Sequence, residues 1–534
     1  MNFDPKLYPH IFNSHVGRNR KIAERGGEKL IFLGQNMKTG SPISIPLRLL
    51  FEHAMFLGHP GSGKTSRQAA LAVQIIGLAC ATVVIADLKG DPFLFHSVRE
   101  ACLYAGLRFR WLTNRVGHPT FAYNPLSQSH LAYLTISQRV QAIIRALGLV
   151  YGEVYGGSWF ESAMERFLNN LITYYEKSLY AFREFAFYCD DPVLYTMGEQ
   201  RLGSVEDWKD ARHVHNEIRR LAENDQCNIT ARTKSYPPEV FENAIDAAQL
   251  FSEPQVVYLN LASASESTWC RNITKLLLYG LLQVGDMLAA AKEGGTRVRS
   301  VPVIFLIDEF SEIASNTFLP VLAQARSREL GLVMGLQSLH QLDMGDKKLS
   351  ESFFSTVGYK HVFSAPDRSS KEYLVSTSGE TTELAASWEQ QIPSGSRVIA
   401  PHMLGPERAV PFVIPFGDPL VRVQPTKRPR LSMDDVSKNG AEPFSSYVHF
   451  ASNTPEASFD GLWTPVWSGF HVDAATYERR QREPFPGQEP GTMIVPHRSE
   501  YSRRYERPDP QQAVQSGQVK SVDEIMRGMQ EDKP

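Results

Sequence analysis

The sequence predicts an α/β fold with a mostly parallel central sheet flanked by helices, and three observations lead to this prediction. Apolar runs of strand length alternate with helical patterns, a glycine-rich loop joins one such run to a helix, and the later runs lack polar alternation. Strands that alternate with helices are typical of parallel sheets, whose strands are buried on both faces. The 534 residues, 42% of them hydrophobic, suffice for a large core and further domains.

The residues around the glycine-rich loop predict a strand, loop, helix and strand in that order. Two short strands precede residue 47, and Ala54 to Leu57 form the strand that enters the loop. A helix is expected from about Gly63 to Gly77, and the apolar run 81–86 is expected to be a strand that ends in Asp87. This order is the βαβ unit of a parallel sheet.

One stretch of this unit, residues 69–86, just reaches the length of a membrane span. Polar and small residues interrupt it at Gln74, Gly77 and Thr82, and it begins four residues after Thr65 of the loop. We therefore predict that it is a helix followed by a buried strand and does not cross a membrane.

Further along the chain, Gln255 to Leu261 and Val303 to Ile307 are unbroken apolar runs and predict two more buried strands. Before them, apolar residues recur at helical spacing at Phe160, Met164, Phe167, Leu168, Leu171, Ile172 and Tyr175. We predict an inserted all-α domain over residues 132–251, within an α/β domain formed by residues 30–131 and 252–420.

The two ends of the chain differ from its middle. Residues 1–29 form a polar and basic N-terminal segment without the pattern of a secretory signal. Prolines become frequent after Leu420, so residues 421–534 predict a loosely structured tail. Near its end, Ser521 to Glu524 form a capping box that predicts a short amphipathic helix, for packing on its own domain or for docking a partner.

Charge and cysteine usage exclude some classes of protein. The formal net charge is −2, so a bound polyanion needs a local basic surface. The five cysteines include no C-x-x-C pair, which argues against a zinc site and a disulfide framework. A reducing cytoplasm is the predicted location.

The glycine-rich loop fits the pattern G-x-x-x-x-G-K-[ST] in full, from Gly58 to Thr65. In such a loop the backbone N–H groups face phosphate oxygens, Lys64 reaches the β- and γ-phosphates, and the Thr65 hydroxyl ligates Mg²⁺. The sequence thus predicts a site for ATP and magnesium. Its predicted nucleotide-binding residues are Gly58, Pro60, Gly61, Ser62, Gly63, Lys64, Thr65 and Ser66.

The strand that ends in Asp308 and Glu309 supplies the second half of the predicted site. Its carboxyl end is expected beside the loop, where Asp308 holds magnesium and Glu309 polarises the attacking water. Many strands end in acidic residues for solubility alone. Together with the complete loop, however, this pair predicts an ATPase that converts ATP and water to ADP and phosphate.

Two further residues are candidates for phosphate chemistry. Gln337 follows another apolar strand and could sense the γ-phosphate, or it could be a solvated strand end. Arg326 and Arg328 precede that strand, and either guanidinium could reach the phosphoryl group of an adjacent subunit. A surface salt bridge is the alternative for each arginine.

These motifs resemble the type IV secretion coupling proteins, which are conjugation ATPases of the FtsK/HerA-like translocase superfamily. The resemblance spans residues 30–420, and its remaining motifs are His53 to Gly58, Asp87-Leu88-Lys89-Gly90-Asp91, Tyr123 to Leu126, Trp159-Phe160, Ile307 to Phe310 and Ala325 to Gly331. It implies a RecA-like motor domain whose all-α insert helps to recognise a DNA-bound relaxase. It also implies a homo-hexamer with ATP sites between subunits and DNA in a central channel.

In this resemblance Arg328 is the better match to the arginine that acts across the subunit interface. Most members carry transmembrane helices before the motor domain, whereas this chain begins almost directly with it. We therefore expect that the protein either binds a separate membrane anchor or functions away from the membrane. Leu88 and Asp91 also depart from the proline and glutamate of the family pattern.

The leading hypothesis is a DNA translocase that couples DNA or a relaxase–DNA complex to a type IV secretion machinery. Two alternatives stay open: an ATP-switched receptor for protein substrates, and a motor in a DNA-processing or anti-phage complex. Lys89 and the basic residues 427–430 are candidates for DNA contact, but ordinary solvated charge explains them equally well. No residue is therefore assigned to DNA.

Overall fold

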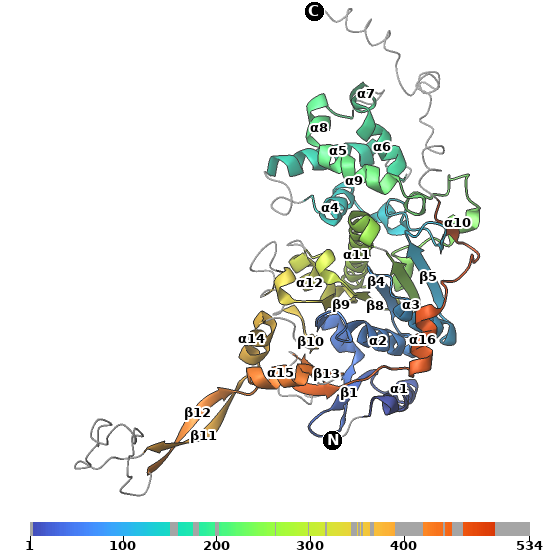
Figure 1. Cartoon of the computed structure of the whole chain (residues 1–534). Coiled ribbons are helices and arrows are strands. Elements are labelled where there is room, and N and C mark those ends of the chain that lie inside the picture. The colour runs from blue at the N-terminus through green and yellow to red at the C-terminus, as the bar shows by residue number, and fades with distance from the viewer. Residues whose placement is uncertain are drawn as a thin grey trace, which may run out of the picture.

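A computed structural model describes residues 4–149, 158–174, 181–197, 202–261, 263–296, 298–314, 318–342, 350, 353, 356–363, 368–389, 420–441, 444–450 and 463–496. An eleven-stranded sheet runs through its centre in the order β2-β1-β14-β13-β10-β3-β9-β8-β4-β7-β5 (Figure 1). Its strands are β1 (Leu30–Asn36), β2 (Pro42–Pro46), β3 (Ala54–Leu57), β4 (Thr82–Asp87), β5 (Arg108–Thr113), β7 (Gln255–Asn260), β8 (Val303–Ile307), β9 (Leu330–Leu336), β10 (Tyr359–Val362), β13 (Ser445–Phe450) and β14 (Thr464–Trp467).

The direction of the strands divides this sheet into two parts. From β10 to β5 every neighbouring pair is parallel. From β2 to β10 every neighbouring pair is antiparallel. Every residue of β3, β4, β7, β8 and β9 is buried, as unbroken apolar runs predict. The prediction of a mostly parallel sheet flanked by helices is confirmed.

Helix α2 (Lys64–Leu78) connects β3 to β4 and packs ten of its residues into the core. The apolar stretch 69–86 is therefore divided between a buried helix and a buried strand, as predicted. In the part of the chain that the structure describes, one helix is long and apolar enough to cross a membrane, Glu266–Glu293. It belongs to α11 (Ser263–Glu293), and 61% of its most apolar window is buried inside the protein.

Two further helices complete the flanks of the sheet. Helix α3 (Pro92–Tyr104) follows β4, and α1 (Tyr8–Glu24) begins near the N-terminus (Figure 1). Tyr8 and Phe12 of α1 are buried, and the Arg67 guanidinium of α2 donates a hydrogen bond of 3.2 Å to the Tyr8 hydroxyl. Helix α1 is thereby joined to the helix that follows the glycine-rich loop.

Between β5 and β7 the chain forms a region of helices that lies at one end of the molecule (Figure 1). Among the described residues from 129 to 251 there is no strand. The helices are α4 (Ile136–Ala146), α5 (Ser158–Tyr174), α6 (Phe182–Asp190), α7 (Pro192–Met197), α8 (Val205–Asp210), α9 (Arg212–Ala222) and α10 (Pro238–Glu242). Thr135 and Gln138 form a capping box at the start of α4, which fixes where that helix begins.

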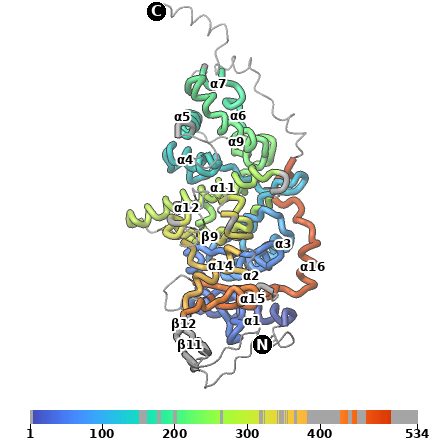
Figure 2. Tube along the Cα trace, turned by 60° about the vertical axis from the view of Figure 1, so that its left-hand side comes forward, coloured from blue at the N-terminus to red at the C-terminus, as the bar shows by residue number. Residues whose placement is uncertain are grey.

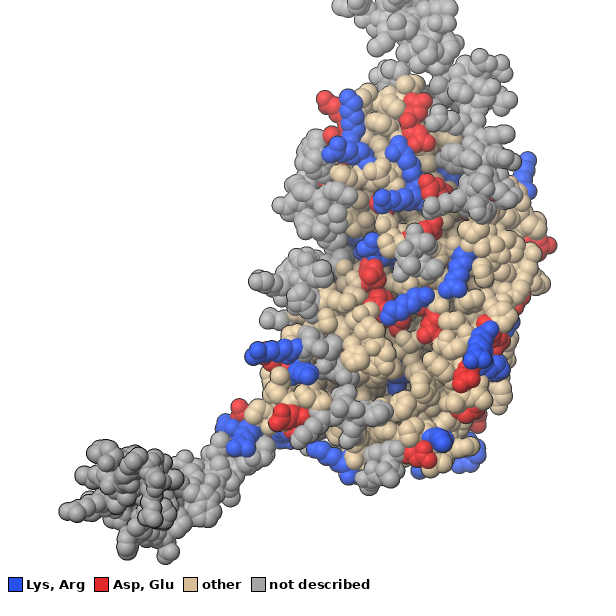
Figure 3. All heavy atoms as spheres, viewed as in Figure 1, with Lys and Arg blue, Asp and Glu red and all other residues tan. Residues whose placement is uncertain are grey.

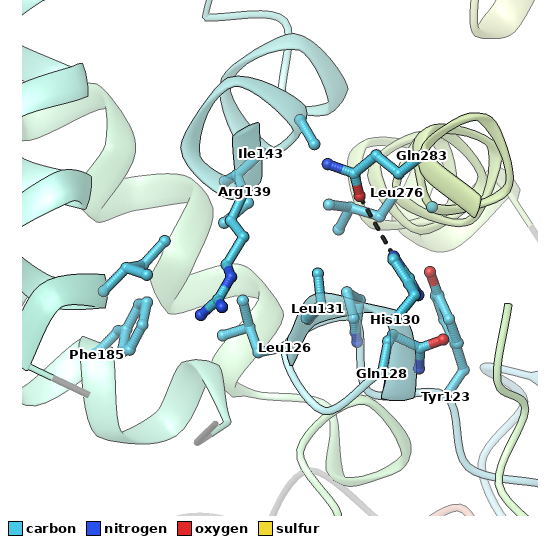
Figure 4. A pocket seen from close by; sticks show the side chains of 14 residues that line it. Tyr123, Leu126, Gln128, His130, Leu131, Arg139, Ile143, Phe185, Leu276 and Gln283 are labelled. Carbon is cyan, nitrogen blue, oxygen red and sulfur yellow. Dashed lines mark hydrogen bonds between the residues drawn. The ribbon is translucent and has the colours of Figure 1, made fainter. Parts of the chain in front are cut away.

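A pocket lies where this helical region meets α11 (Figure 4). Leu276 and Gln283 of α11 face Ile143 of α4 and Phe185 of α6 across it. His130 Nε2 lies 3.3 Å from the side-chain oxygen Oε1 of Gln283. Apolar side chains dominate its walls, so it marks a packing junction between the helical region and the sheet domain.

The C-terminal part of the chain corrects one prediction. Strands β13 and β14 join the central sheet, where β13 pairs with β10 and β14 pairs with both β13 and β1. The prediction of a loosely structured tail over residues 421–534 is therefore wrong for these strands. Short apolar runs within the proline-rich composition, including the buried Val448, Val466 and Trp467, find partners that are distant in sequence.

Other elements of this part also pack on the body or on each other. Helix α16 (Ala474–Arg482) packs on α3 (Figure 2). The Arg480 guanidinium of α16 donates hydrogen bonds to the Ser97 hydroxyl and the Glu100 carboxylate of α3. Helix α14 (Arg368–Thr377) packs against α15 (Met433–Ala441), and β11 (Glu380–Glu389) pairs antiparallel with β12 (Leu420–Pro429). The predicted amphipathic helix near residues 521–529 lies outside the described residues.

His53 directly precedes β3, and its ring contacts the backbone of α12 (Phe318–Ala325) and β9. One ring nitrogen lies 2.7 Å from the Leu322 carbonyl oxygen, and the other accepts a 3.2 Å hydrogen bond from the Leu332 N–H. This pair of contacts suits the neutral ring. Burial is the largest cause that lowers the pKa of His53, which falls from 6.5 to about 4.

The stability of the fold should therefore depend on His53 below pH 6.5. The stabilisation is complete above pH 6.5 and is lost as pH falls toward about 4, because only the unfolded chain binds a proton there. We expect protonation of His53 to lower the free energy of unfolding by about 3 kcal/mol between pH 7 and pH 4. Denaturant unfolding of the wild type and His53→Gln at several pH values measures the difference. Parallel pH profiles for the two proteins would contradict it.

Candidate functional site

The predicted glycine-rich loop follows β3 and turns directly into α2. Gly61 and Gly63 have φ values of 79° and 95°, a left-handed conformation that side chains disfavour, so glycine lets the loop curl. The Gly58 N–H donates to the Leu336 carbonyl at 3.1 Å, which fastens the loop to β9. The N-terminus of α2, where N–H groups have no helical partner, therefore faces the interior of the loop.

Lys64 lies over this loop and is buried. Its ammonium group donates a hydrogen bond to the Gly58 carbonyl, so the lysine crosses back to the start of the loop. Burial is the main cause that lowers the pKa of Lys64 to about 8, Lys89 lowers it further, and Glu309 and Asp308 oppose the shift. Lys64 thus places its positive charge at the mouth of the loop.

Asp308 and Glu309 follow β8, and the parallel strands bring their carboxylates to the edge of the sheet where the loop lies. The Thr65 hydroxyl donates a 3.3 Å hydrogen bond to Asp308 Oδ1. Asp308 is 2% exposed, and its Oδ2 has no hydrogen-bond partner among the described residues. Burial raises the pKa of Asp308, while Lys89 and Lys64 act in the opposite direction.

Gln337 lies at the end of β9, between the strand of the loop and the strand of the acidic pair. Its side-chain amide donates a hydrogen bond to Glu309 Oε1, and Glu309 is 6% exposed. The structure therefore brings Lys64, Thr65, Asp308, Glu309 and Gln337 together, as the sequence predicts.

Lys89 belongs to the same cluster, although the sequence analysis left it unassigned. Its ammonium group forms an ion pair with Glu309 Oε2 and lies 3.8 Å from Asp308 Oδ2. Burial alone lowers the pKa of Lys89, but the carboxylates of Asp308 and Glu309 outweigh burial and raise it. The signal in the sequence is the position of Lys89 two residues after Asp87, at the end of the strand beside β8.

Asp87 holds the turn that carries this lysine. It is fully buried and accepts hydrogen bonds from the N–H groups of Lys89, Gly90 and Asp91 at 3.0, 2.8 and 2.6 Å. The Tyr258 hydroxyl donates a further bond of 2.8 Å. Burial, together with the nearby Asp308 carboxylate, raises the pKa of Asp87 to about 7, and the hydrogen bonds partly offset it. Asp87 therefore fixes the backbone turn from which the Lys89 side chain extends toward Glu309.

The chemistry of these residues fits a nucleotide phosphate chain with a divalent cation. Magnesium prefers oxygen ligands, and the Thr65 hydroxyl lies next to the buried Asp308 carboxylate, whose Oδ2 lacks a hydrogen bond within the described chain. The loop adds backbone N–H groups and Lys64 for anionic oxygens. The site next to the glycine-rich loop thus combines hydroxyl, carboxylate, ammonium and backbone N–H groups.

Arg328 is not part of this cluster within one chain. It lies in the turn η7 (Arg326–Arg328) at the start of β9, whereas the loop lies at the carboxyl ends of the strands. The seven residues of β9 separate the two edges by about 20 Å. Arg328 forms an ion pair with Asp286 of α11 and donates to Gln324 at 3.0 Å, and Arg326 bonds to Glu52 at 3.3 Å. Their roles across a subunit interface stay predictions.

Comparison with known proteins supports the fold. Residues 302–402 match the family model described as the TraM recognition site of TraD and TraG. This segment contains Asp308, Glu309, Arg328 and Gln337. The unbound bacterial conjugative coupling protein TrwBdeltaN70 has a similar structure, with a TM-score of 0.53 and 13% identity over 88% of this chain and 93% of that chain.

The predicted resemblance to the conjugative coupling proteins is confirmed. The plasmid coupling protein TrwB in complex with ADP and Mg²⁺ is also similar, with a TM-score of 0.53 and 12% identity over 87% of this chain and 92% of that chain. In complex with a non-hydrolysable ATP analogue it gives a TM-score of 0.52 and 14% identity over 88% of this chain and 94% of that chain.

At these identities the likeness to the coupling proteins is one of fold. It includes the predicted RecA-like arrangement, in which a mostly parallel sheet carries the loop at its carboxyl edge. A search of curated protein sequences finds no match.

Proposed function

We propose that this chain is an ATP-hydrolysing motor that moves DNA, or a relaxase–DNA complex, toward a type IV secretion machinery. The convergence of Lys64, Thr65, Asp308, Glu309 and Gln337 at one edge of a coupling-protein fold carries the proposal. The similar coupling protein TrwB has been crystallised with ADP and Mg²⁺ and with nucleotide analogues, which supports ATP and magnesium as ligands here.

The residues divide the work of hydrolysis between them. The loop N–H groups and Lys64 hold the phosphate oxygens, and Thr65 and Asp308 would hold the magnesium ion. When bound, magnesium supplies positive charge to the phosphate oxygens. Glu309 orients a water molecule and accepts a proton from it as the water oxygen attacks the γ-phosphorus and the bond to ADP breaks.

Lys89 and Gln337 set the state of Glu309 before this step. Their contacts hold both oxygens of the Glu309 carboxylate. While these contacts last, the carboxylate is occupied by two side chains of the protein and is not free to orient a water molecule. We infer that Lys89 withdraws from Glu309 when ATP is in place, and that Gln337 then connects Glu309 to the γ-phosphate.

The proposed motor is a homo-hexamer with DNA in its central channel and nucleotide sites between subunits. Lysine and arginine are interspersed with aspartate and glutamate on the face shown in Figure 3. This agrees with the net charge of −2, and we propose that DNA binding depends on local contacts inside the ring. The helical region 132–251 is the proposed recruiting domain for relaxase, and a separate membrane anchor is the proposed link to the secretion machinery.

The first test is the steady-state ATPase rate with and without single-stranded or double-stranded DNA, at two salt concentrations. We expect DNA to raise the rate several-fold and high salt to erase the increase, because phosphate contacts release counterions. Lys64→Ala serves as the control for contaminating ATPases. A rate that is equal with and without either DNA at low salt would refute the DNA motor.

The match of residues 302–402 to a recognition segment favours a second candidate, an ATP-switched receptor for protein substrates. In that case substrate capture would survive Lys64→Ala, and hydrolysis would be slow and indifferent to DNA. Pull-down of a relaxase with the wild type and this variant, run beside the ATPase assay, separates the two candidates.

A further inference from the structure

A large cavity lies between four helices of the sheet domain. Its walls come mainly from α1, from the C-terminal half of α2, from α3, and from α16 with the three residues before it. These helices lie together in Figures 1 and 2. The cavity has a volume of about 570 Å³, which is within the range of pockets that bind a ligand. Because it opens to solvent, we call it the α1 groove.

Apolar side chains form the larger part of the lining of the α1 groove. They include Phe12, Val16, Val73, Leu78, Ala101 and Tyr104. Tyr104 ends α3 and is 83% exposed, and the neighbouring Leu103 is 58% exposed. Arg20, Glu100 and Asp473 add charge to the lining. An exposed apolar hollow with charged residues around it is typical of an interaction site.

Polar side chains in the same walls have atoms without partners. Asn19 Nδ2, Arg480 Nε and both ring nitrogens of His471 are buried and form no hydrogen bond with any described residue. Burial lowers the pKa of His471 to about 3, so its ring is neutral and offers one donor and one acceptor. Buried polar groups in folded proteins almost always have partners. These atoms therefore indicate that a further segment with acceptor oxygens completes the groove.

The segment 521–530, which lies outside the described residues, has the sequence pattern of such an occupant. Its apolar residues stand at positions i, i+3, i+4 and i+7, the spacing of side chains that a helix lays into an apolar groove. They are Val522, Ile525, Met526 and Met529. A helix of this length is marginal on its own in water, and Gly528 weakens it further. Burial of the apolar stripe would therefore be needed to stabilise it.

The dimensions of the groove and the segment agree. The groove follows α1 from Pro9 to Arg20, which corresponds to about 17 Å of helix. Ten residues in a helix measure about 15 Å. A helix over residues 521–530 can thus lie along α1 for its whole length.

The charges of the two partners are complementary. Helix α1 carries the exposed basic residues Arg18, Arg20 and Lys21, and Glu24 is its only acidic residue. Residues 521–534 contain four acidic residues, at positions 523, 524, 531 and 532, and two basic ones. The excess of positive charge on α1 therefore favours the approach of this acidic segment.

The length of the chain allows the segment to reach the groove. After α16 the chain runs beside α3, where the Arg99 guanidinium donates a 3.2 Å hydrogen bond to Glu489, and the described residues end at 496. The 25 residues from there to Ser521 can span up to about 80 Å, whereas the 13 residues of α3 measure about 20 Å. A tether raises the concentration of the segment at the groove of its own chain, which is therefore favoured over the groove of another copy.

We propose that residues 521–530 form an amphipathic helix that docks in the α1 groove of the same chain, with its apolar stripe against Phe12, Val16 and Leu78. The docked helix would contact the C-terminal half of α2, the helix that begins at Lys64. Neither the groove nor the segment requires a nucleotide or DNA, so docking goes beyond the proposed function.

The test uses the full chain with a photoreactive benzoylphenylalanine in place of Met526, and identifies cross-linked peptides by mass spectrometry after irradiation. We expect cross-links to α1, α2 or α3 within one chain. Val16→Glu puts a charge on the wall of the groove and should lower their yield by about tenfold or more, because burial of an unpaired charge is unfavourable. Val205→Glu, at a residue of α8 that is 45% exposed, is the matched control and should leave the yield unchanged.

Each other outcome would overturn the proposal. Cross-links to residues outside the groove, or none at all, would show that the segment does not dock there. Cross-links between isotope-labelled and unlabelled chains in a mixture would place the segment on a second copy or on another surface of it. If circular dichroism shows that Val16→Glu impairs folding, Ile525→Asp, which changes only the segment, should lower the yield instead. An unchanged yield in Ile525→Asp would refute docking through the apolar stripe. The ATPase assay with DNA tests the motor separately.

Discussion

Replacing Glu309 with glutamine should lower kcat for ATP hydrolysis by about 10²- to 10⁴-fold, the usual contribution of a positioned general base. The amide keeps the size of the side chain but cannot accept the proton from water. Binding of MgATP should change little, since Lys64, Thr65 and Asp308 remain in place. Steady-state hydrolysis together with calorimetric titration of a slowly hydrolysed ATP analogue measures both quantities.

Glu312→Gln is the matched control for this variant. Glu312 lies three residues further along the chain, is exposed, and has no place in the cluster described above. The same change of charge there should leave kcat within about twofold of the wild type. A Glu309→Gln protein that hydrolyses ATP at the wild-type rate would show that another group activates the water.

The position of the candidate catalytic cluster could be predicted because each of its members belongs to a short motif at the end of a strand. Lys64 and Thr65 follow β3, Asp308 and Glu309 follow β8, and Gln337 follows β9. Parallel strands in one sheet bring all their carboxyl ends to one edge. Motifs that each follow such a strand are therefore predicted to lie close together in the structure.

Other residues of the site could not be found in this way. Lys89 belongs to the motif 87–91, but that motif does not show whether the lysine forms an ion pair or is a solvated charge. Its ion pair with Glu309 depends on β4 lying beside β8. Phe444 and Phe470 line a pocket with Ser62 of the loop although they lie far from it in sequence, because they adjoin β13 and β14. The pairing of these short strands with β10 and β1 depends on tertiary contacts, which composition and periodicity do not encode.

Replacing Arg328 with alanine should reduce DNA-stimulated kcat by about 10³- to 10⁵-fold, the effect of losing an arginine that acts on the transferring phosphoryl group. Within one chain this arginine lies at the edge of the sheet opposite the loop, so any action on a phosphate requires a neighbouring subunit. Its ion pair with the half-exposed Asp286 contributes at most about 1 kcal/mol to stability. Loss of folding therefore cannot account for a decrease of this size.

Mixing two inactive variants distinguishes action across the interface from a structural role. Lys64→Ala subunits retain Arg328, and Arg328→Ala subunits retain the complete loop. A mixed ring contains interfaces where an intact loop faces an intact arginine, so mixing should restore a fraction of the hydrolysis rate. Arg326→Ala, which removes the more exposed arginine of the same turn and its bond to Glu52, should keep most of the activity. If the mixture stays inactive while both variants form rings of normal size, Arg328 does not act on the phosphate of a neighbouring subunit, and the residue that completes the ATP site must be sought elsewhere on the chain.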